Sequence, residues 1–354
     1  MKKKFYVSAS PHIHENVNIK KVMWSVVIAL IPALVAAYIV FGIRAIWLTM
    51  LGIVSAVVTE AIIQYAMKKP ITISDGSAVI TGMLVSYNLS SNVSWWIPVI
   101  GSVFAIGIGK QMFGGLGFNP FNPALLARAF LMASWPTQMT AKWLPTKFGS
   151  ISGLSEGIIQ GGNIQLKELI TSATPLNVAK TVKETILTSS DPSVVNTART
   201  IFHKISSLDT ISNLFWGNVG GCIGEVSAAA LLLGAAYLAY HHYIGWRIPI
   251  GYIGTVAILG WIFGGINGLF TGPVLFHIFS GGLILGAFFM ATDMVTSPVT
   301  KKGRLIFGIG CGVITIIIRL IGGYPEGVSY SILLMNITVP LIDRYTTPKT
   351  FGLV

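Results

Sequence analysis

Long apolar runs recur along this chain of 354 residues. Several of them reach about 20 residues, the length that an α-helix needs to cross the hydrocarbon core of a bilayer. Hydrophobic residues make up 53% of the chain and charged residues only 10%, whereas a soluble domain has about a quarter of its residues charged. Too few polar side chains remain to cover a globule in water. The sequence therefore predicts an all-α polytopic membrane protein.

Hydrophobic segments lie on both sides of one polar stretch, residues 135–213, with five before it and five after it. They span residues 22–43, 45–67, 76–90, 95–112, 121–135, 223–241, 247–264, 274–292, 304–321 and 328–342. The third, fifth and eighth are short or interrupted by Gly, Asn and Pro, which favours broken helices packed inside protein or lining a cavity. We expect a membrane repeat of five spans at 1–134, a loop at 135–213 and a second repeat of five spans at 214–354. No cleavable signal peptide is expected, because residues 1–21 are polar.

The distribution of Lys and Arg predicts the orientation. With the N-terminus in the cytoplasm and alternating spans, fourteen of these residues outside the polar stretch fall on the cytoplasmic side and two on the other side. The cytoplasmic residues are Lys2, Lys3, Lys4, Lys20, Lys21, Lys68, Lys69, Lys110, Arg247, Lys301, Lys302, Arg304, Arg344 and Lys349, and the outer ones are Arg44 and Arg319. The positive-inside rule then predicts cytoplasmic termini and an extracytoplasmic loop 135–213. The net charge of +12 reflects topology, so nucleic acid is not an expected partner.

A weak internal echo favours an inverted repeat. Ile80-Thr81-Gly82 is similar to Ile284-Leu285-Gly286, and Gly114-Gly115 is similar to Gly322-Gly323. Because each half has an odd number of spans, the two halves would have opposite orientations in the membrane. The residues alone are therefore compatible with a transporter or channel built from two inverted halves.

The polar stretch contains Leu169-Ile170-Thr171-Ser172-Ala173-Thr174-Pro175-Leu176. By itself this is an ordinary loop sequence. Its position between two apolar arrays makes it the place where a threonine hydroxyl could carry a large, water-facing prosthetic group.

Ionisable residues at membrane depth are few. Glu60, Arg128 and Glu225 lie in or at the start of spans, and Asp75, Asp293 and Arg319 lie near span ends. Intramembrane charges are costly and are by default candidates for function, so Glu60, Glu225 and Asp293 are candidates for an ion path. A structural ion pair is the alternative for each charge.

Other polar residues are expected to have structural roles or no metal-binding role. His277 lies on an apolar face and is expected to be a hydrogen-bonded core residue. Cys222 and Cys311 stand alone in apolar surroundings, so no iron–sulfur cluster and no metal site are expected from this chain. The chain has no P-loop and no G-x-G-x-x-G motif, which excludes a standard nucleotide-binding domain.

The densest cluster of helix-breaking residues is Gly114-Gly115-Leu116-Gly117-Phe118-Asn119-Pro120-Phe121-Asn122-Pro123. Two Asn-Pro steps and three glycines cannot form a regular helix. The segment is either a tight inner turn or a place where Asn119 and Asn122 contact a flavin or an ion.

Several motifs together resemble one family: the D subunit of the Rnf electron-transport complex and the B subunit of the sodium-pumping NADH:quinone oxidoreductase. In the first half the motifs are Ser10-Pro11-His12, Asp75-Gly76-Ser77-Ala78, and Gly109-Lys110-Gln111-Met112-Phe113-Gly114-Gly115-Leu116-Gly117 followed by Phe121-Asn122-Pro123-Ala124. In the second half they are Gly224-Glu225-Val226-Ser227, Thr296-Ser297-Pro298, Lys302-Gly303-Arg304, Gly322-Gly323-Tyr324-Pro325-Glu326-Gly327, Leu334-Met335-Asn336 and Pro340-Leu341-Ile342-Asp343-Arg344. The short N-terminus looks more like the Rnf D subunit.

The resemblance implies a fold and a cofactor. The fold would be two inverted five-helix halves, similar to urea transporters. A flavin transferase would attach FMN by a phosphoester to Thr174, within the segment formed by Ser172, Ala173, Pro175 and Leu176. This chain has Thr171-Ser172 where the family usually has a Gly before Ala-Thr. A noncovalent riboflavin is a further expected cofactor.

The resemblance also implies a function and partners. The chain would be the D subunit of an ion-translocating ferredoxin:NAD oxidoreductase in a bacterial or archaeal cytoplasmic membrane. It would pass electrons coupled to Na⁺ or H⁺ export and would not be active alone. Its partners would be the flavin-bearing G subunit, the membrane A and E subunits, the cytoplasmic B and C subunits and membrane lipid. The alternatives are the B subunit of the sodium-pumping oxidoreductase, a cofactor-free solute channel or transporter, and a structural membrane scaffold.

Overall fold

The computed structural model describes residues 18–140, 174–189, 191–266, 268–323 and 326–348. Within these ranges the elements are helices, with one isolated bridge between Ser90 and Cys222. The part before the polar stretch contains α1 (Ile19–Phe41), α2 (Ile43–Ala66), η1 (Ile73–Asp75), α3 (Ser77–Tyr87), α4 (Trp96–Ile106), η2 (Gly107–Gln111) and α5 (Pro123–Ser134). The described part of the polar stretch contains α6 (Pro136–Thr140), α9 (Pro175–Thr188) and α10 (Pro192–Ile205), and α11 (Leu208–Trp216) runs past its end. The last part contains η4 (Ile223–Glu225), α12 (Ala228–Tyr240), α13 (Arg247–Phe263), α14 (Val274–Phe279), α15 (Leu283–Leu285), η5 (Gly286–Met290), α16 (Lys301–Ile321) and α17 (Val328–Thr346).

The prediction of an all-helical membrane protein is confirmed for these residues. The helices α1, α2 and α16 are long and apolar enough to cross a bilayer. Large apolar side chains also project from the molecule along α2, where Ile43 is 71% exposed and Trp47 and Ile62 are each 61% exposed. Exposed apolar surface on this scale is typical of a protein whose surroundings are lipid.

The described helices lie close to the expected spans. The last helix continues to Thr346 instead of ending at 342, and α12 begins at Ala228 instead of 223. The eighth segment, 274–292, is broken as its glycines suggested. It forms the short helix α14, then a turn in which Gly281 has a φ of 66°, and then α15 and η5. A residue with a side chain is disfavoured at that φ, so the chain turns at glycine between the two short helices.

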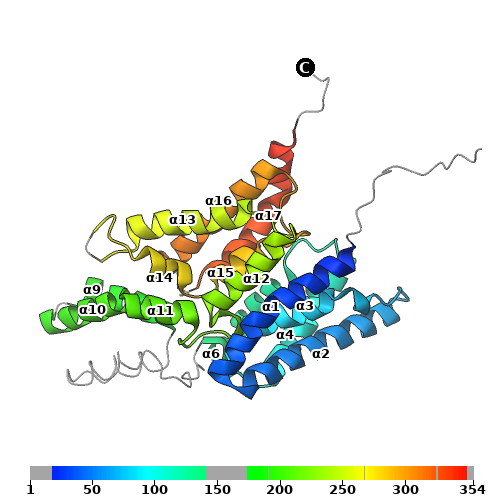
Figure 1. The fold of residues 1–354 in the computed structure, drawn as a ribbon, viewed down its shortest axis with the longest axis horizontal. Coiled ribbons are helices and arrows are strands. Elements are labelled where there is room, and N and C mark those ends of the chain that lie inside the picture. The colour runs from blue at the N-terminus through cyan, green and yellow to red at the C-terminus, as the bar shows by residue number, and fades with distance from the viewer. Residues whose placement is uncertain (1–17, 141–173, 190, 267, 324–325, 349–354) are drawn as a thin grey trace, which may run out of the picture.

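The two membrane parts pack against each other over a shared core. The core contains Leu30 and Leu125 from the first part and Phe307 and Ile332 from the second. Helix α1 lies beside α12 (Figure 1), and α5 contacts α17. The Ile223 N–H donates to the Leu89 carbonyl at 2.9 Å, which joins the ends of two short elements across the boundary.

Corresponding elements recur at a nearly constant spacing. Helices α1, α2, α3, α4 and α5 begin at residues 19, 43, 77, 96 and 123, whereas α12, α13, α15, α16 and α17 begin at 228, 247, 283, 301 and 328. The separations between the five pairs of starts are 204 to 209 residues. The helices of the two parts therefore begin at corresponding positions, although their lengths and breaks differ.

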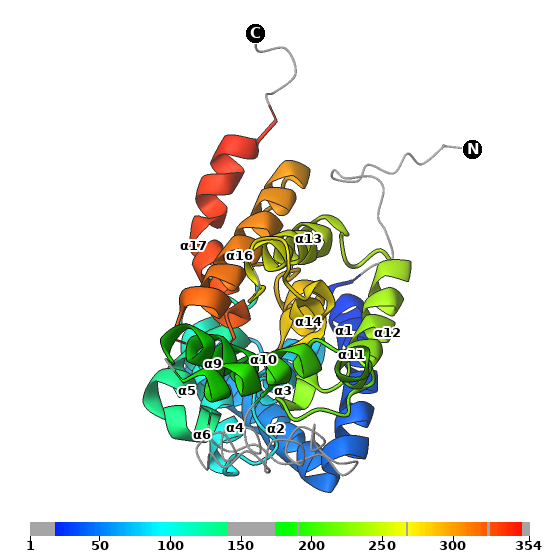
Figure 2. The same ribbon diagram turned by 90° about the vertical axis from the view of Figure 1, so that its left-hand side faces the viewer.

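The helices of the polar stretch gather at one end of the molecule. In Figure 1, α9, α10 and α11 lie at the left, whereas α1 begins at the right and α17 ends towards the upper right; Figure 2 shows this helical layer face on. The layer has a small core of its own, in which Val182, Ala198 and Ile201 pack with Phe276 of α14. The described part of what we expected to be a loop is thus largely helical, because α9 and α10 have an apolar side to bury.

Candidate functional site: two cavities walled by buried ion pairs

Thr174 lies at the first turn of α9. Its backbone is extended, with φ −67° and ψ 152°, and its Oγ1 accepts a hydrogen bond from the Asn177 N–H at 3.4 Å. Pro175 follows at the first helical position. Threonine as the N-cap and proline at the next position are a standard sequence signal for a helix start, so this part of the predicted loop could have been recognised as a helix.

A cavity of about 280 Å³ opens beside Thr174. We call it the threonine cavity. Arg128 and Met132 of α5, Thr174 and Asn177 of α9, and Glu326 and Tyr330 around the start of α17 line it. A smaller cavity of about 20 Å³ lies on the other side of Thr174 and is lined also by Glu225 and Glu326. Thr174 is only 6% exposed, but it lines both of these cavities.

Arg128 forms the centre of a buried polar network at this cavity. Its Nη1 donates to the Asn88 Oδ1 at 2.6 Å and lies 3.4 Å from the Glu225 carboxylate, and its Nη2 donates to the Glu326 carboxylate. Ligand atoms of Cys222, Glu225 and Glu326 lie within 4.8 Å of one another. The guanidinium of Arg128 offsets part of the negative charge of this group, which is necessary because unpaired buried charges are strongly destabilising.

The residues at Thr174 fit a phosphate ester with an attached planar group. The positive end of the α9 dipole favours a negative group at its first turn, and Arg128 supplies a cation on the same cavity wall. Of the other predicted residues in this segment, Pro175 and Leu176 are buried, and Leu176 packs into the small core of the helical layer. Ser172 and Ala173 lie outside the described residues.

A second buried ion pair lies within the first half. The Lys110 Nζ is 2.7 Å from Glu60 Oε1 and 2.8 Å from Oε2, and it also donates to the Ser77 Oγ at 2.6 Å. The side-chain amide groups of Gln64 and Gln111 donate to Glu60 Oε1 at 3.1 Å and 3.0 Å. Lys110 is only 2% exposed. Lys110, which we count among the residues on the cytoplasmic side, is therefore buried, because its ammonium forms an ion pair with Glu60.

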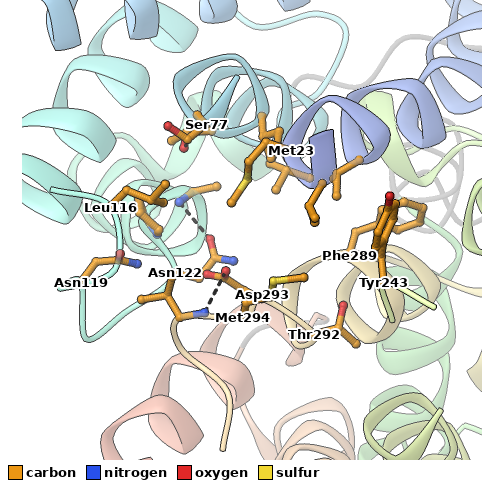
Figure 3. A pocket seen from close by; sticks show the side chains of 18 of the residues that line it. Met23, Ser77, Leu116, Asn119, Asn122, Tyr243, Phe289, Thr292, Asp293 and Met294 are labelled. Atoms are coloured by element: carbon orange, nitrogen blue, oxygen red, sulfur yellow. Dashed lines mark hydrogen bonds between the residues drawn. The ribbon is translucent and has the colours of Figure 1, made fainter. Parts of the chain in front are cut away.

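A cavity of about 100 Å³ adjoins this pair. We call it the asparagine cavity, because Asn119 and Asn122 lie on its wall together with Lys110, Ser77 and Asp293. Figure 3 shows the remaining lining, which is largely apolar and includes Met23, Phe289 and Met294. Apolar walls with a few convergent polar groups are typical of small-molecule sites.

The two asparagines are held differently. Asn122 caps α5 by accepting from the Ala124 N–H at 3.0 Å, and its Nδ2 donates to the Met290 carbonyl of the second half at 3.3 Å. Asn119 donates to the Phe121 carbonyl at 3.0 Å, whereas its buried Oδ1 has no hydrogen-bond partner among the described residues. An unsatisfied buried acceptor next to a cavity is available to a ligand donor.

The three ion-path candidates do not come together. Glu60 belongs to the Lys110 network and Glu225 to the Arg128 network. Asp293 lines the asparagine cavity, where it accepts from the Val295 N–H at 3.4 Å and from the Thr296 hydroxyl at 3.2 Å. Sequence reasoning missed Lys110 and Glu326 as site residues. Their partners are 50 and 198 positions away in sequence, so no local pattern indicates the pairing.

Comparison with known proteins identifies the family. The family model described as NQR2, RnfD, RnfE matches residues 6–352. The chain belongs to the NQR2, RnfD, RnfE family. The predicted resemblance is thereby confirmed over nearly the whole chain.

Three relatives named as D subunits of ion-translocating oxidoreductase complexes are similar to this chain over nearly its whole length. The D subunit of the Na⁺-translocating ferredoxin:NAD⁺ oxidoreductase complex of Acetobacterium woodii is 48% identical over 98% of this chain and 95% of the relative. The D subunit of the proton-translocating ferredoxin:NAD⁺ oxidoreductase complex of Clostridium ljungdahlii is 46% identical over 98% and 96%. The D subunit of the ion-translocating oxidoreductase complex of Stutzerimonas stutzeri is 40% identical over 95% and 92%.

The buried pair generates a stability prediction. In Lys110→Met, Glu60 loses its cation in a site without solvent, and we expect a loss of about 3–5 kcal/mol in the free energy of unfolding. Adding Glu60→Gln to Lys110→Met removes the orphaned charge and should recover at least half of that loss. The measurement is thermal unfolding of the purified chain in detergent, followed by tryptophan fluorescence.

The matched control is Lys302→Met on the exposed start of α16, which should change the unfolding free energy by no more than about 0.5 kcal/mol. A Lys110→Met chain as stable as the wild type would contradict the assigned role of the pair.

Proposed function

We propose that this protein is the D subunit of an ion-translocating ferredoxin:NAD⁺ oxidoreductase complex, the Rnf complex, in a bacterial or archaeal cytoplasmic membrane. The observation that carries the proposal is end-to-end similarity at 46–48% identity to two proteins with that name. One of them is named for Na⁺ and the other for protons, so the proposal covers both ions.

We propose further that Thr174 carries FMN through a phosphoester bond. Support comes from the threonine cavity, which provides volume next to the hydroxyl, and from the α9 N-terminus, which favours the phosphate negative charge. FMN bound there would supply one-electron transfer to and from neighbouring carriers. A flavin transferase from the host would make the bond.

The residues of the chain have separate tasks in this site. Asn177 holds the Thr174 hydroxyl through its N–H and thereby fixes the side chain at the cavity edge. Arg128 presents a cation to the cavity, and Glu225 and Glu326 hold its guanidinium in place.

The FMN proposal is tested by Thr174→Ala. The wild-type chain, purified from its native host, should fluoresce in a denaturing gel and should have a mass increased by FMN less water. Both signals should be absent from Thr174→Ala, because alanine has no hydroxyl to esterify. Intact-protein mass spectrometry and in-gel fluorescence provide the measurement.

Thr181→Ala, on the same helix, is the matched control and should retain both signals. An unmodified, non-fluorescent wild-type chain from the native host would exclude the covalent flavin and would favour a cofactor-free transporter.

We propose that the membrane parts are two inverted five-helix repeats, at 1–134 and 214–354. The recurrence of helix starts at a spacing of 204 to 209 residues supports the repeat. The positive-inside distribution supports cytoplasmic termini and an extracytoplasmic segment 135–213. It is compatible with the arrangement in Figure 1, where α9–α11 lie at the opposite end from the start of α1.

The asparagine cavity is proposed as the site of a noncovalent riboflavin. The unpartnered Asn119 Oδ1 and the apolar lining support a ligand that is mostly aromatic with a few polar edges. Asp293 on the same wall, together with Glu60 and Glu225, is proposed to belong to the ion path. The proposed partners are the G, A, E, B and C subunits of the complex and membrane lipid.

The riboflavin proposal predicts a specific loss in Asn119→Leu. The substitution removes the free acceptor and adds apolar volume at the cavity wall, so acid-extractable flavin should fall by at least about tenfold, the equivalent of about 1.4 kcal/mol. Gel fluorescence from flavin on Thr174 should remain. The measurement is chromatography of flavin released by acid from equal amounts of chain. Equal release from the variant and the wild type would contradict the assignment of this cavity.

A further inference from the structure

A third cavity, of about 70 Å³, lies between the helical layer α9–α10 and the second membrane half. We call it the basic cavity, because Lys180, Lys183, His277 and Arg319 line it and the carboxylate on its wall is that of Glu184. The Glu184 side chain is 63% exposed, whereas Arg319 is 4% exposed. The positive charge therefore lies at the buried end of the cavity and the negative charge at its outer edge.

Arg319 is a buried cation without a carboxylate partner in the described part of the chain. Its Nη1 donates to the His277 carbonyl at 2.6 Å and its Nη2 to the Ser280 carbonyl at 3.0 Å, whereas its Nε has no hydrogen-bond partner there. Glu326 lies near the same glycine, Gly281, as the Arg319 Nη2, but its carboxylate is paired with Arg128. Main-chain carbonyls solvate the Arg319 guanidinium but do not neutralise it, and a buried charge without a direct ion pair is costly.

His277 is a second buried group with an unused atom on the same wall. It is 6% exposed, and its Nδ1 has no partner among the described residues, so our expectation of a fully hydrogen-bonded core histidine was wrong. The packing fixes its ring: a Cβ added to Gly264 would lie 2.6 Å from the His277 Nε2. The unused nitrogen is therefore held in place rather than free to turn towards another partner.

Lys180 and Lys183 add two further ammonium groups to the cavity wall, and each has hydrogen-bond donors that remain available. The Lys183 Nζ donates to the Phe263 carbonyl at 3.0 Å. The Lys180 Nζ donates to the Gly322 carbonyl and lies 3.8 Å from the Glu184 carboxylate. An ammonium group has three donors, so each lysine retains donors for a further acceptor. Partial burial lowers the pKa of Lys183, and a bound anion would offset that effect.

We propose that the basic cavity binds a phosphate oxyanion, and that this phosphate belongs to an anionic phospholipid. The donors around the cavity match a tetrahedral oxyanion, which accepts from several directions at once. The rest of the lining includes Leu176, Phe202, Phe276 and Leu320 and the 76% exposed Leu187, which suits the apolar part of a lipid.

The test uses the full chain in detergent after delipidation. Native mass spectrometry follows the binding of added phosphatidylglycerol, phosphatidylcholine or inorganic phosphate. We expect one phosphatidylglycerol to bind at least about tenfold more tightly than phosphatidylcholine. Arg319→Gln should weaken phosphatidylglycerol binding by at least about tenfold, and Lys183→Gln by about fivefold.

Arg199→Gln is the matched control, because Arg199 is an exposed cation of the same helical layer outside the cavity; it should bind like the wild type. If Arg319→Gln does not fold, the binding of phosphatidylglycerol to Lys183→Gln tests the proposal instead. Binding of inorganic phosphate alone, with the same dependence on the variants, would support the oxyanion site and identify free phosphate as its ligand. Equal binding of both lipids, or phosphatidylglycerol binding unchanged in Lys183→Gln, would overturn the proposal.

Discussion

The contact between Arg128 and its three partners is the interaction on which the arrangement of the two halves depends. Arg128 lies on α5 of the first half and holds Asn88 of the same half, while its carboxylate partners Glu225 and Glu326 belong to the second half. Removing one partner from such a buried group typically costs about 3–5 kcal/mol. The buried charge of Arg128 is therefore tolerated only when the two halves pack so that Glu225 and Glu326 reach it.

Each cavity proposed to hold a flavin has a member of a buried ion pair on its wall. Arg128 lines the threonine cavity, and Lys110, which is held by Glu60, lines the asparagine cavity. Glu60 and Glu225, two of the three acids that first suggested an ion path, thus also have a structural task, which is to position cations at the two cavities.

The sequence was sufficient to predict the features that depend on local pattern. Apolar runs placed the helices to within a few residues, and glycines in 274–292 correctly indicated a break, because both signals reside in neighbouring residues. Thr174 followed by Pro175 is also a local signal, for the start of α9, although it was interpreted as a loop. The resemblance to a family added the proposal of a flavin on Thr174, which composition and spacing do not suggest.

Features that depend on distant contacts could not be predicted in this way. Lys110 lies near the end of an apolar segment and was counted among the cytoplasmic charges, and only the fold brings it to Glu60. Glu326 reaches Arg128 across 198 positions. Likewise, a histidine on an apolar face gives no sign in the sequence of whether its nitrogens find partners, and for His277 one of them does not within the described residues.

The central claim is that electrons on their way from ferredoxin to NAD⁺ pass through a flavin on Thr174. The most direct measurement is ferredoxin-driven NAD⁺ reduction, together with ion uptake into proteoliposomes, by the assembled complex that contains Thr174→Ala in this chain. The account predicts an intact complex in which both activities are lost together. A fully assembled complex that lacks flavin on this chain and still reduces NAD⁺ with coupled ion transport would contradict it.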